Sequence, residues 1–310
     1  MSVIILCPGQ GSQKVGMGKD LAERFPAARD LFAAVDEALG VALTRLMWEG
    51  PEEELTLTHN AQPAILAHSA AVFALVRSKL GVPALGLGHS LGEYSAYTAA
   101  GALDVAAAVR LVRRRGELML EAGKQRPGAM AAVLALDPAL VVEACAEASR
   151  PGEVAVAANL NEPGQTVISG DPAAVERAGE GCKARGAKRV IALKVSGAFH
   201  SPLMAPAVAG LREALAATPF RAPAFPVIAN ATAHPVHAAA DATRLLADQL
   251  TAPVRWTESV RAAAGQVPGA AWVEVGPGAV LGGLLKKIVP GASATALGTA
   301  DEVTKFLEAV

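Results

Sequence analysis

Residues 86–103 read GLGHSLGEYSAYTAAGAL, and this stretch decides the fold. Ser90 stands at the centre of a Gly-x-Ser-x-Gly motif, after an apolar run and before an alanine-rich one. The apolar run predicts a buried strand and the alanine-rich run predicts a helix. Glycines on both sides of a serine allow the sharp turn that lifts a nucleophilic hydroxyl above a sheet. We therefore predict that Ser90 is a nucleophile; a simple helix cap is the alternative.

Further short apolar segments extend this pattern on both sides of the motif. Residues 3–7, 84–87, 226–229 and 272–275 each predict a buried strand, and helical segments separate them. Apolar strands joined by helical crossovers indicate a parallel sheet covered on both faces, which places the chain in the α/β class.

The middle of the chain has a different order of elements. Strand-like segments occur at residues 130–136, 154–158, 165–169 and 189–195, and the turn-rich NLNEPG separates the second from the third. Helices follow Asp137 and Asp171, both good N-caps. The order β-α-β-β-α-β is typical of a ferredoxin-like unit. We therefore predict a small inserted subdomain over residues 127–198 and a larger α/β domain formed by residues 1–126 and 199–310.

The overall composition excludes several classes of protein. The chain has 310 residues and a formal net charge of −1, which argues against a nucleic-acid partner. No apolar run reaches the ~18 residues that a membrane helix needs. The three cysteines show neither a disulfide framework nor metal-ligand spacing, and the N-terminus lacks the features of a signal peptide. We expect a cytoplasmic protein with no bound metal.

A nucleophilic serine needs a base, and the chain offers six histidines. His200, in KVSGAFHSPLM, follows the last strand of the predicted insert and is the best candidate, because Ser then precedes His as in elbow hydrolases. His89 adjoins Ser90 and should point away from it. Structural or surface roles remain open for the others: His59, His68, His234 and His237. No acidic residue is marked as the orienting group, so a backbone carbonyl can take that place.

Arg115 lies on an unexpected face of the helix that follows Asp104. At 100° per residue, Arg115 falls among apolar residues, three positions after Val112 and four before Met119. A guanidinium keeps its proton and should not face a core unpaired. A structural salt bridge, or a guanidinium end that reaches water, is one explanation, and a clamp for a substrate carboxylate is the other.

The loop PGQGSQ, residues 8–13, follows the first predicted strand. Neither the dinucleotide fingerprint nor the Walker pattern fits, because Lys14 stands where the former needs glycine and GxxxxGK is absent. A simple turn is one interpretation. The other is an oxyanion hole, in which the backbone N–H of Gln10 joins that of Leu91, the residue after the nucleophile.

Several segments, in order along the whole chain, carry a family resemblance: CPGQGSQ, GHSLGEYSA, an arginine–glycine pair in the next helix, NEPGQTVISG, GAFHSPLM, QLTAPVRWTESV and VEVGPGAVL. Together they resemble the malonyl-CoA:acyl carrier protein transacylases, an acyltransferase family of fatty-acid and polyketide synthesis. The resemblance implies an α/β-hydrolase-like core with a parallel sheet and an inserted ferredoxin-like (βαββαβ) subdomain, in agreement with the division drawn above.

The resemblance also implies a reaction and its catalytic residues. A malonyl group would pass from malonyl-CoA to Ser90 and then to the phosphopantetheine thiol of acyl carrier protein, with no cofactor. His200 would act as base and acid, and the N–H groups of Gln10 and Leu91 would hold the oxyanion.

Further residues would bind the acyl group or shape the cleft. Arg115 would hold the malonyl carboxylate, Gln249 would hydrogen-bond near His200, and Asn161 would line the cleft. Phe199 would fill the space into which an α-methyl branch points.

Other functions and one docking surface remain open from the sequence. A serine hydrolase or thioesterase would share the elbow and the histidine, and a non-catalytic scaffold would share the fold. An acyltransferase of a polyketide pathway would share every motif. A basic rim for an acidic carrier, or an ordinary solvated surface, is predicted for six residues: Lys183, Arg185, Lys188, Arg189, Lys286 and Lys287.

Overall fold

The computed structural model describes residues 2–309 and contains two separate sheets. The larger sheet has the strand order β10-β9-β1-β2-β7-β8, and its neighbouring strands are parallel except for the β7–β8 pair. Its strands are β1 (Val3–Cys7), β2 (Leu85–Gly88), β7 (Val227–Ile228), β8 (Pro235–Val236), β9 (Ala271–Val275) and β10 (Ala294–Leu297).

Helices cover both faces of this sheet, because alternate residues of each strand point to opposite sides. In β1, Ile5 and Cys7 belong to one buried cluster, whereas Ile4 and Leu6 belong to another. The helices of the first cluster are α1 (Lys19–Arg24), α2 (Pro26–Leu39), α3 (Leu43–Glu49), α4 (Glu52–Thr56), α5 (Thr58–Leu80), α6 (Leu91–Ala99), α7 (Val105–Gln125), α10 (Ala205–Ala217), α11 (Ala239–Asp248) and α14 (Ala300–Glu308). The helices of the second are α12 (Trp256–Gln266) and α13 (Val280–Ile288). In residues 2–309, every helix is too short or too polar to span a membrane.

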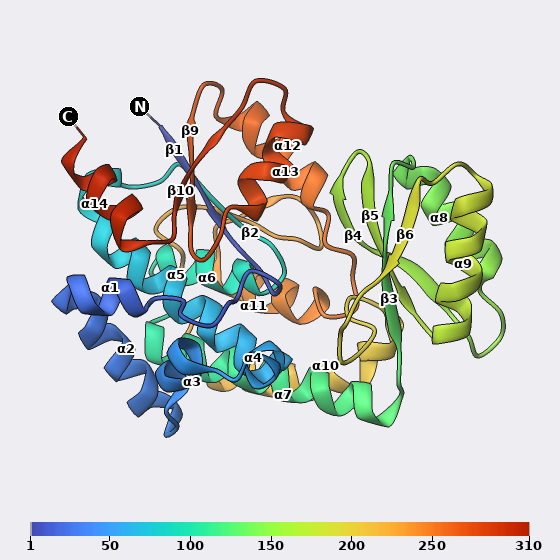
Figure 1. Cartoon of the computed structure of the whole chain (residues 1–310), viewed down its shortest axis with the longest axis horizontal. Helices are drawn as coiled ribbons and strands as arrows, with labels where there is room; N and C mark the ends of the chain where they lie inside the picture. Colours follow the sequence, from blue (N-terminus) through green and yellow to red (C-terminus); the bar gives the residue numbers. More distant parts are fainter. Residues whose placement is uncertain (1, 310) are drawn as a thin grey trace.

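The second sheet stands at one end of the molecule, with its two helices on the outer side (Figure 1). Its four strands are antiparallel in the order β4-β5-β3-β6. A separate buried cluster fills the space between this sheet and the two helices. The elements are β3 (Ala129–Leu134), α8 (Pro138–Ala148), β4 (Ala155–Glu162), β5 (Gln165–Gly170), α9 (Pro172–Ala184) and β6 (Arg189–Ala192).

The predicted α/β class with a parallel sheet is confirmed, whereas several local predictions are wrong. The NLNEPG segment is mostly strand, because β4 pairs with β5 as far as Glu162 and the turn is confined to residues 163–164. The last strand of this sheet stops at Ala192, where its pairing with β3 ends.

Asp171 precedes α9 as predicted but does not cap it. Its carboxylate accepts hydrogen bonds from the Arg126 guanidinium and from the backbone N–H of Val154. Asp137, in contrast, accepts a hydrogen bond from the N–H of Ala139 and caps α8. The ion pair with Arg126 explains the difference, because it turns the Asp171 side chain away from its own helix.

Candidate active site

Ser90 occupies a strained turn between β2 and α6. Its backbone has φ 53° and ψ −107°, a conformation that residues with a Cβ rarely adopt. The flanking glycines permit a very close approach of the chain: a Cβ on Gly92 would lie 2.0 Å from the carbonyl oxygen of Cys7. A Cβ on Gly88 would lie 1.9 Å from the carbonyl carbon of Gly92. The sequence around Ser90 therefore forms a sharp turn at the end of β2, with the geometry that a nucleophile elbow requires.

His200 lies beside the Ser90 hydroxyl. Ser90 Oγ is 2.8 Å from His200 Nε2, and His200 Nδ1 is 3.0 Å from the backbone carbonyl oxygen of Gln249. A carbonyl can only accept, so Nδ1 carries the proton and donates it. Nε2 therefore carries no proton and can accept a hydrogen bond from the serine hydroxyl. A general base requires this arrangement. His200 also has a positive φ of 56°.

The electrostatic surroundings keep His200 neutral. Burial, and to a smaller extent the positive charge of Arg115, lower the pKa of His200 to about 3, against the opposing effect of the hydrogen bond to Gln249. At neutral pH the imidazole is therefore uncharged, and its Nε2 can accept the proton of Ser90.

Arg115 brings a buried positive charge to the same point. Its side chain is 1% exposed, and it donates from Nη1 to Gln62 Oε1 at 2.6 Å. Nη2 donates to Gln249 Oε1 at 3.0 Å and to Ser90 Oγ at 3.2 Å. Nε is buried and has no protein acceptor among residues 2–309. No carboxylate forms a salt bridge with Arg115 in that range. The alternative of a structural salt bridge is therefore wrong.

Three polar residues that the sequence interpretation missed complete the network. Asn230 Oδ1 accepts a hydrogen bond from the backbone N–H of Ser90 at 2.7 Å. Glu93 accepts from the Asn230 backbone N–H at 2.9 Å and from Gln249 Nε2 at 2.8 Å. Gln62 holds Arg115. Each lies in an apolar sequence context, and a polar residue at a buried helical position is the signal that could have identified Gln62 and Glu93.

A chain of hydrogen bonds connects Arg115 with the PGQGSQ loop. Gln62 Nε2 donates to Thr58 Oγ1 at 2.8 Å, and Thr58 Oγ1 donates to Gln10 Oε1 at 2.9 Å. Within residues 2–309, the backbone N–H groups of Gln10 and Leu91 donate to no protein acceptor. Leu91 is the first residue of α6, where a helix leaves its N–H groups free and its dipole favours negative charge.

A cleft of about 460 Å³ lies between the two sheets and is lined by Gln10, Ser90, Leu91, Arg115 and His200. Its lining comes from the elbow, from α7 and from strands β3 to β5 of the smaller sheet. The predicted residues Phe199 and Asn161 both line it. Asn161 Oδ1 lies 2.9 Å from His89 Nε2, and Asn161 Nδ2 donates to Gln165 Oε1 at 2.9 Å. All eight residues singled out from the sequence are thus at or beside one cleft: Gln10, Ser90, Leu91, Arg115, Asn161, Phe199, His200 and Gln249.

The remaining histidines lie elsewhere or in supporting positions. His89 packs against Trp256, with 5.5 Å between ring centroids, and lines the cleft through its contact with Asn161. His68 is buried and its Nε2 lies 2.8 Å from the carbonyl oxygen of Gly298. His234 is exposed.

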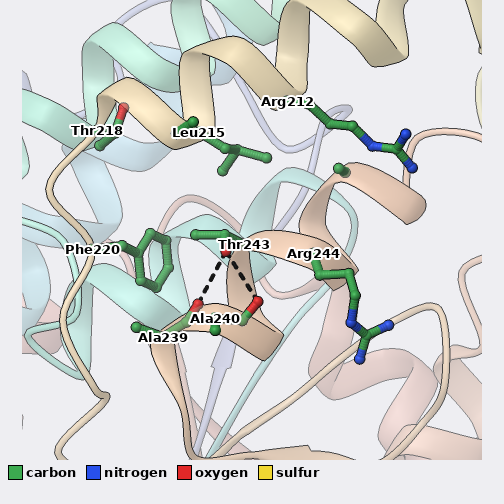
Figure 2. A pocket seen from close by; sticks show the side chains of 10 residues that line it. Arg212, Leu215, Thr218, Phe220, Ala239, Ala240, Thr243 and Arg244 are labelled. Atoms are coloured by element: carbon green, nitrogen blue, oxygen red, sulfur yellow. Dashed lines mark hydrogen bonds between the residues drawn. The ribbon is translucent and has the colours of Figure 1, made fainter.

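A second cavity, of about 480 Å³, lies between α10 and α11 and is lined by none of the predicted site residues (Figure 2). Its charged groups are Arg212 and Arg244, and both pair with Asp248. In residues 2–309 no cluster of three or more His, Cys, Asp or Glu side chains could hold a metal ion.

Comparison with known proteins agrees with this geometry. Residues 4–309 match the model of the acyl transferase domain family. The chain belongs to this family. Similar members of the acyl transferase family include two malonyl CoA-acyl carrier protein transacylases. The one from Bacillus subtilis is 47% identical over 286 residues, covering 92% of this chain and 90% of the relative. The one from Escherichia coli K12 is 46% identical over 303 residues, covering 97% of each.

Solved acyl transferase structures have the same overall arrangement. An acyl carrier protein S-malonyltransferase from Vibrio cholerae has a TM-score of 0.93 at 42% identity, covering 98% of this chain and 99% of that one. A malonyl-transacylase in complex with its type II PKS acyl-carrier protein has a TM-score of 0.95 at 43% identity, covering 99% of each chain.

Proposed function

We propose that this protein transfers the malonyl group of malonyl-CoA to the phosphopantetheine thiol of an acyl carrier protein, supplying fatty-acid synthesis. The observation that carries the proposal is the buried Arg115 guanidinium 3.2 Å from the Ser90 hydroxyl. A cation fixed beside a nucleophile suits an acyl group that ends in a carboxylate. The names of the relatives support the same reaction.

The first half-reaction acylates Ser90. Oγ attacks the thioester carbonyl carbon as its proton passes to His200 Nε2. The backbone N–H groups of Gln10 and Leu91 stabilise the oxyanion that forms on the carbonyl oxygen. When the tetrahedral intermediate collapses, the carbon–sulfur bond breaks and the coenzyme A thiolate takes the proton from Nε2. The products are coenzyme A and a malonyl ester on Ser90.

The second half-reaction runs the same steps with the carrier. His200 removes the proton of the phosphopantetheine thiol, and the thiolate attacks the ester carbon. Collapse returns the proton from Nε2 to Ser90 Oγ and leaves the malonyl group on the carrier. Serine and histidine carry both half-reactions, so the proposed transfer needs no cofactor.

Arg115 selects the acyl group in this scheme. Its guanidinium, with Nη2 3.2 Å from Ser90 Oγ, can donate to the malonyl carboxylate, and Gln62 and Gln249 hold it in place. A hydrogen bond to a charged group is worth about 1.5–3 kcal/mol. An acetyl group leaves the buried guanidinium without that partner, so we expect its transfer to be about ten- to a hundredfold slower.

The rest of the cleft positions the acyl chain and limits water. We assign to the Gln249 backbone carbonyl the orientation of His200, and to Asn161 the support of the cleft wall through His89. Phe199 occupies space beside His200 and excludes an α-methyl branch. Apolar side chains line much of the cleft and disfavour a well-placed water: Met119, Met130, Val167, Val195 and Phe199.

The proposal includes the finer description of the fold. We assign residues 1–126 and 199–310 to an α/β-hydrolase-like catalytic domain, supported by the elbow at the end of a parallel strand. We assign residues 127–198 to a ferredoxin-like subdomain, supported by its β-α-β-β-α-β order and its sheet order β4-β5-β3-β6. A cytoplasmic location stays a prediction.

One experiment separates transfer from hydrolysis. The protein is incubated with malonyl-CoA alone, with carrier bearing phosphopantetheine, and with carrier lacking it. We expect malonyl-carrier only with the phosphopantetheine form, and little free malonate in any mixture. Rapid release of malonate without a carrier thiol would instead identify a thioesterase.

A polyketide carrier is the second candidate acceptor, because the neighbour at 43% identity is in complex with a type II PKS carrier. Rates measured side by side with a fatty-acid carrier and a polyketide carrier decide between them. A higher second-order rate constant with the fatty-acid carrier supports the proposed pathway, and the reverse order contradicts it.

A further inference from the structure

Glu93 is a buried carboxylate, one turn of α6 after the nucleophile, and the proposed mechanism does not use it. Its side chain is 0% exposed. One carboxylate oxygen, Oε2, accepts both the Asn230 backbone N–H and Gln249 Nε2, whereas Oε1 has no partner. A buried carboxylate with an unpaired oxygen costs folding free energy, so stability alone does not explain a glutamate here.

The contact with Gln249 fixes which end of that amide faces Arg115. Gln249 Nε2 donates to Glu93 Oε2 and, at 3.0 Å, to the backbone carbonyl of Ser90. Oε1 is consequently turned toward Arg115 Nη2, 3.0 Å away. Burial raises the pKa of Glu93 to about 7, but Oε2 accepts these hydrogen bonds whether the group is ionised or carries a proton on Oε1. Glu93 therefore selects the NH₂ end of the amide. The opposite orientation would set an NH₂ group against the guanidinium, donor against donor.

The contact with Asn230 supports the elbow from the other side. Glu93 Oε2 accepts the Asn230 N–H, while Asn230 Oδ1 accepts the Ser90 N–H at 2.7 Å. Asn230 Nδ2 donates to the Gly88 carbonyl, also at 2.7 Å. One carboxylate oxygen therefore joins two segments, distant in sequence, that both touch the nucleophile.

We infer that Glu93 is a positioning residue that sets the preference for malonyl over acetyl groups, by orienting the Gln249 amide and thereby Arg115. The inference rests on the proposed malonyl transfer. It predicts that loss of the Glu93 acceptor lowers malonyl transfer more than acetyl transfer, because only the malonyl group needs a correctly placed guanidinium.

The test measures the acylation rate constant of Ser90 with malonyl-CoA and with acetyl-CoA, and takes their ratio. In Glu93→Met, which has no strong acceptor, we expect the ratio to fall about tenfold or more. Glu93→Gln can place its carbonyl oxygen at the Oε2 position and accept both hydrogen bonds, so it should keep the ratio within about threefold. If Glu93→Met does not fold, Glu93→Asp replaces it, since the shorter chain withdraws the acceptor from Gln249.

Two controls distinguish positioning from general damage. Glu274→Gln alters another fully buried glutamate, which holds the N–H groups of Leu281 and Gly282, and should leave the ratio unchanged. In an Arg115→Ala background, adding Glu93→Met should change the ratio by less than about threefold.

The inference is overturned if Glu93→Met lowers both rates equally, if Glu93→Gln loses selectivity as fully as Glu93→Met, or if the effect persists without Arg115. These results differ from a failure of the proposed function, in which the unmodified protein itself would not be acylated by malonyl-CoA.

Discussion

At the scale of single residues, the site depends on the positive charge of Arg115, which is buried although no carboxylate of the described residues forms an ion pair with it. Arg115 has three hydrogen-bond contacts to neutral groups, and its Nε–H has none. Desolvation of a guanidinium is expensive and is normally offset by an ion pair. In the proposed function a substrate carboxylate supplies that ion pair, so we expect binding of the malonyl group and selection of it to be the same interaction.

Arg115→Ala is the substitution that isolates this interaction. We expect malonyl acylation of Ser90 to fall about a hundredfold or more, and acetyl acylation to stay level or rise, because the unpaired charge is gone. Single-turnover rates with the two thioesters measure the effect. Arg114→Ala provides the control, since Arg114 is on the same helix with its side chain 51% exposed. Equal losses for both acyl groups would rule out the clamp.

At the scale of elements, the sequence predicts those that carry a strong local pattern. The Gly-x-Ser-x-Gly turn and the helix bearing Arg115 could be predicted because periodicity and turn chemistry are local. Asn230 could not, since it reaches Ser90 only because β7 pairs with β2, and strand order is not local information. Strand β8, with two residues, is also too short to show a period, whereas β7 lies within the apolar segment 226–229 that predicts a strand.

The packing of α5 against α7 sets the position of Arg115, and Gly116 makes that packing possible. A Cβ on Gly116 would lie 2.5 Å from the backbone Cα of His59 in α5. Gly116→Ala should therefore separate the helices, lower the free energy of unfolding by about 1–3 kcal/mol and reduce malonyl acylation. Urea denaturation and the acylation assay measure the two effects.

Gly283→Ala is the matched control for Gly116→Ala. Gly283 lies within α13 with nothing within 4 Å of an added Cβ, so alanine should raise stability by about 0.5–1 kcal/mol. Unchanged stability of Gly116→Ala would show that the helices are not in tight contact at this point.

At the scale of the whole molecule, the cleft exists because the smaller sheet and the larger sheet contribute opposite walls. Residues from β3, β4 and β5 lie on one side of the cleft and the Ser90 turn lies on the other. The cleft has a volume of about 460 Å³. The presence of two different sheets follows from the sequence pattern, but how the sheets meet does not. Their relative placement depends on contacts such as the pairing of Asn159 with Val254, which no periodicity predicts.

Stability of the whole fold should fall in acid, in part through His68. Burial lowers the pKa of His68 from 6.5 to about 4, against the effect of its hydrogen bond to Gly298. Between these values the unfolded chain binds the proton and the folded chain does not, so stability falls as the pH drops below 6.5. His68→Gln should remove about 2 kcal/mol of the loss between pH 7 and pH 5. Urea denaturation at both pH values measures it, and an unchanged loss would contradict this role.

The most direct test of the central claim is the intact mass of the protein after exposure to malonyl-CoA. The account predicts a mass increase of one malonyl group, located on Ser90, absent from Ser90→Ala, and lost again when carrier bearing phosphopantetheine is added. A protein that stays unmodified, or a malonyl group on any residue other than Ser90, would contradict it.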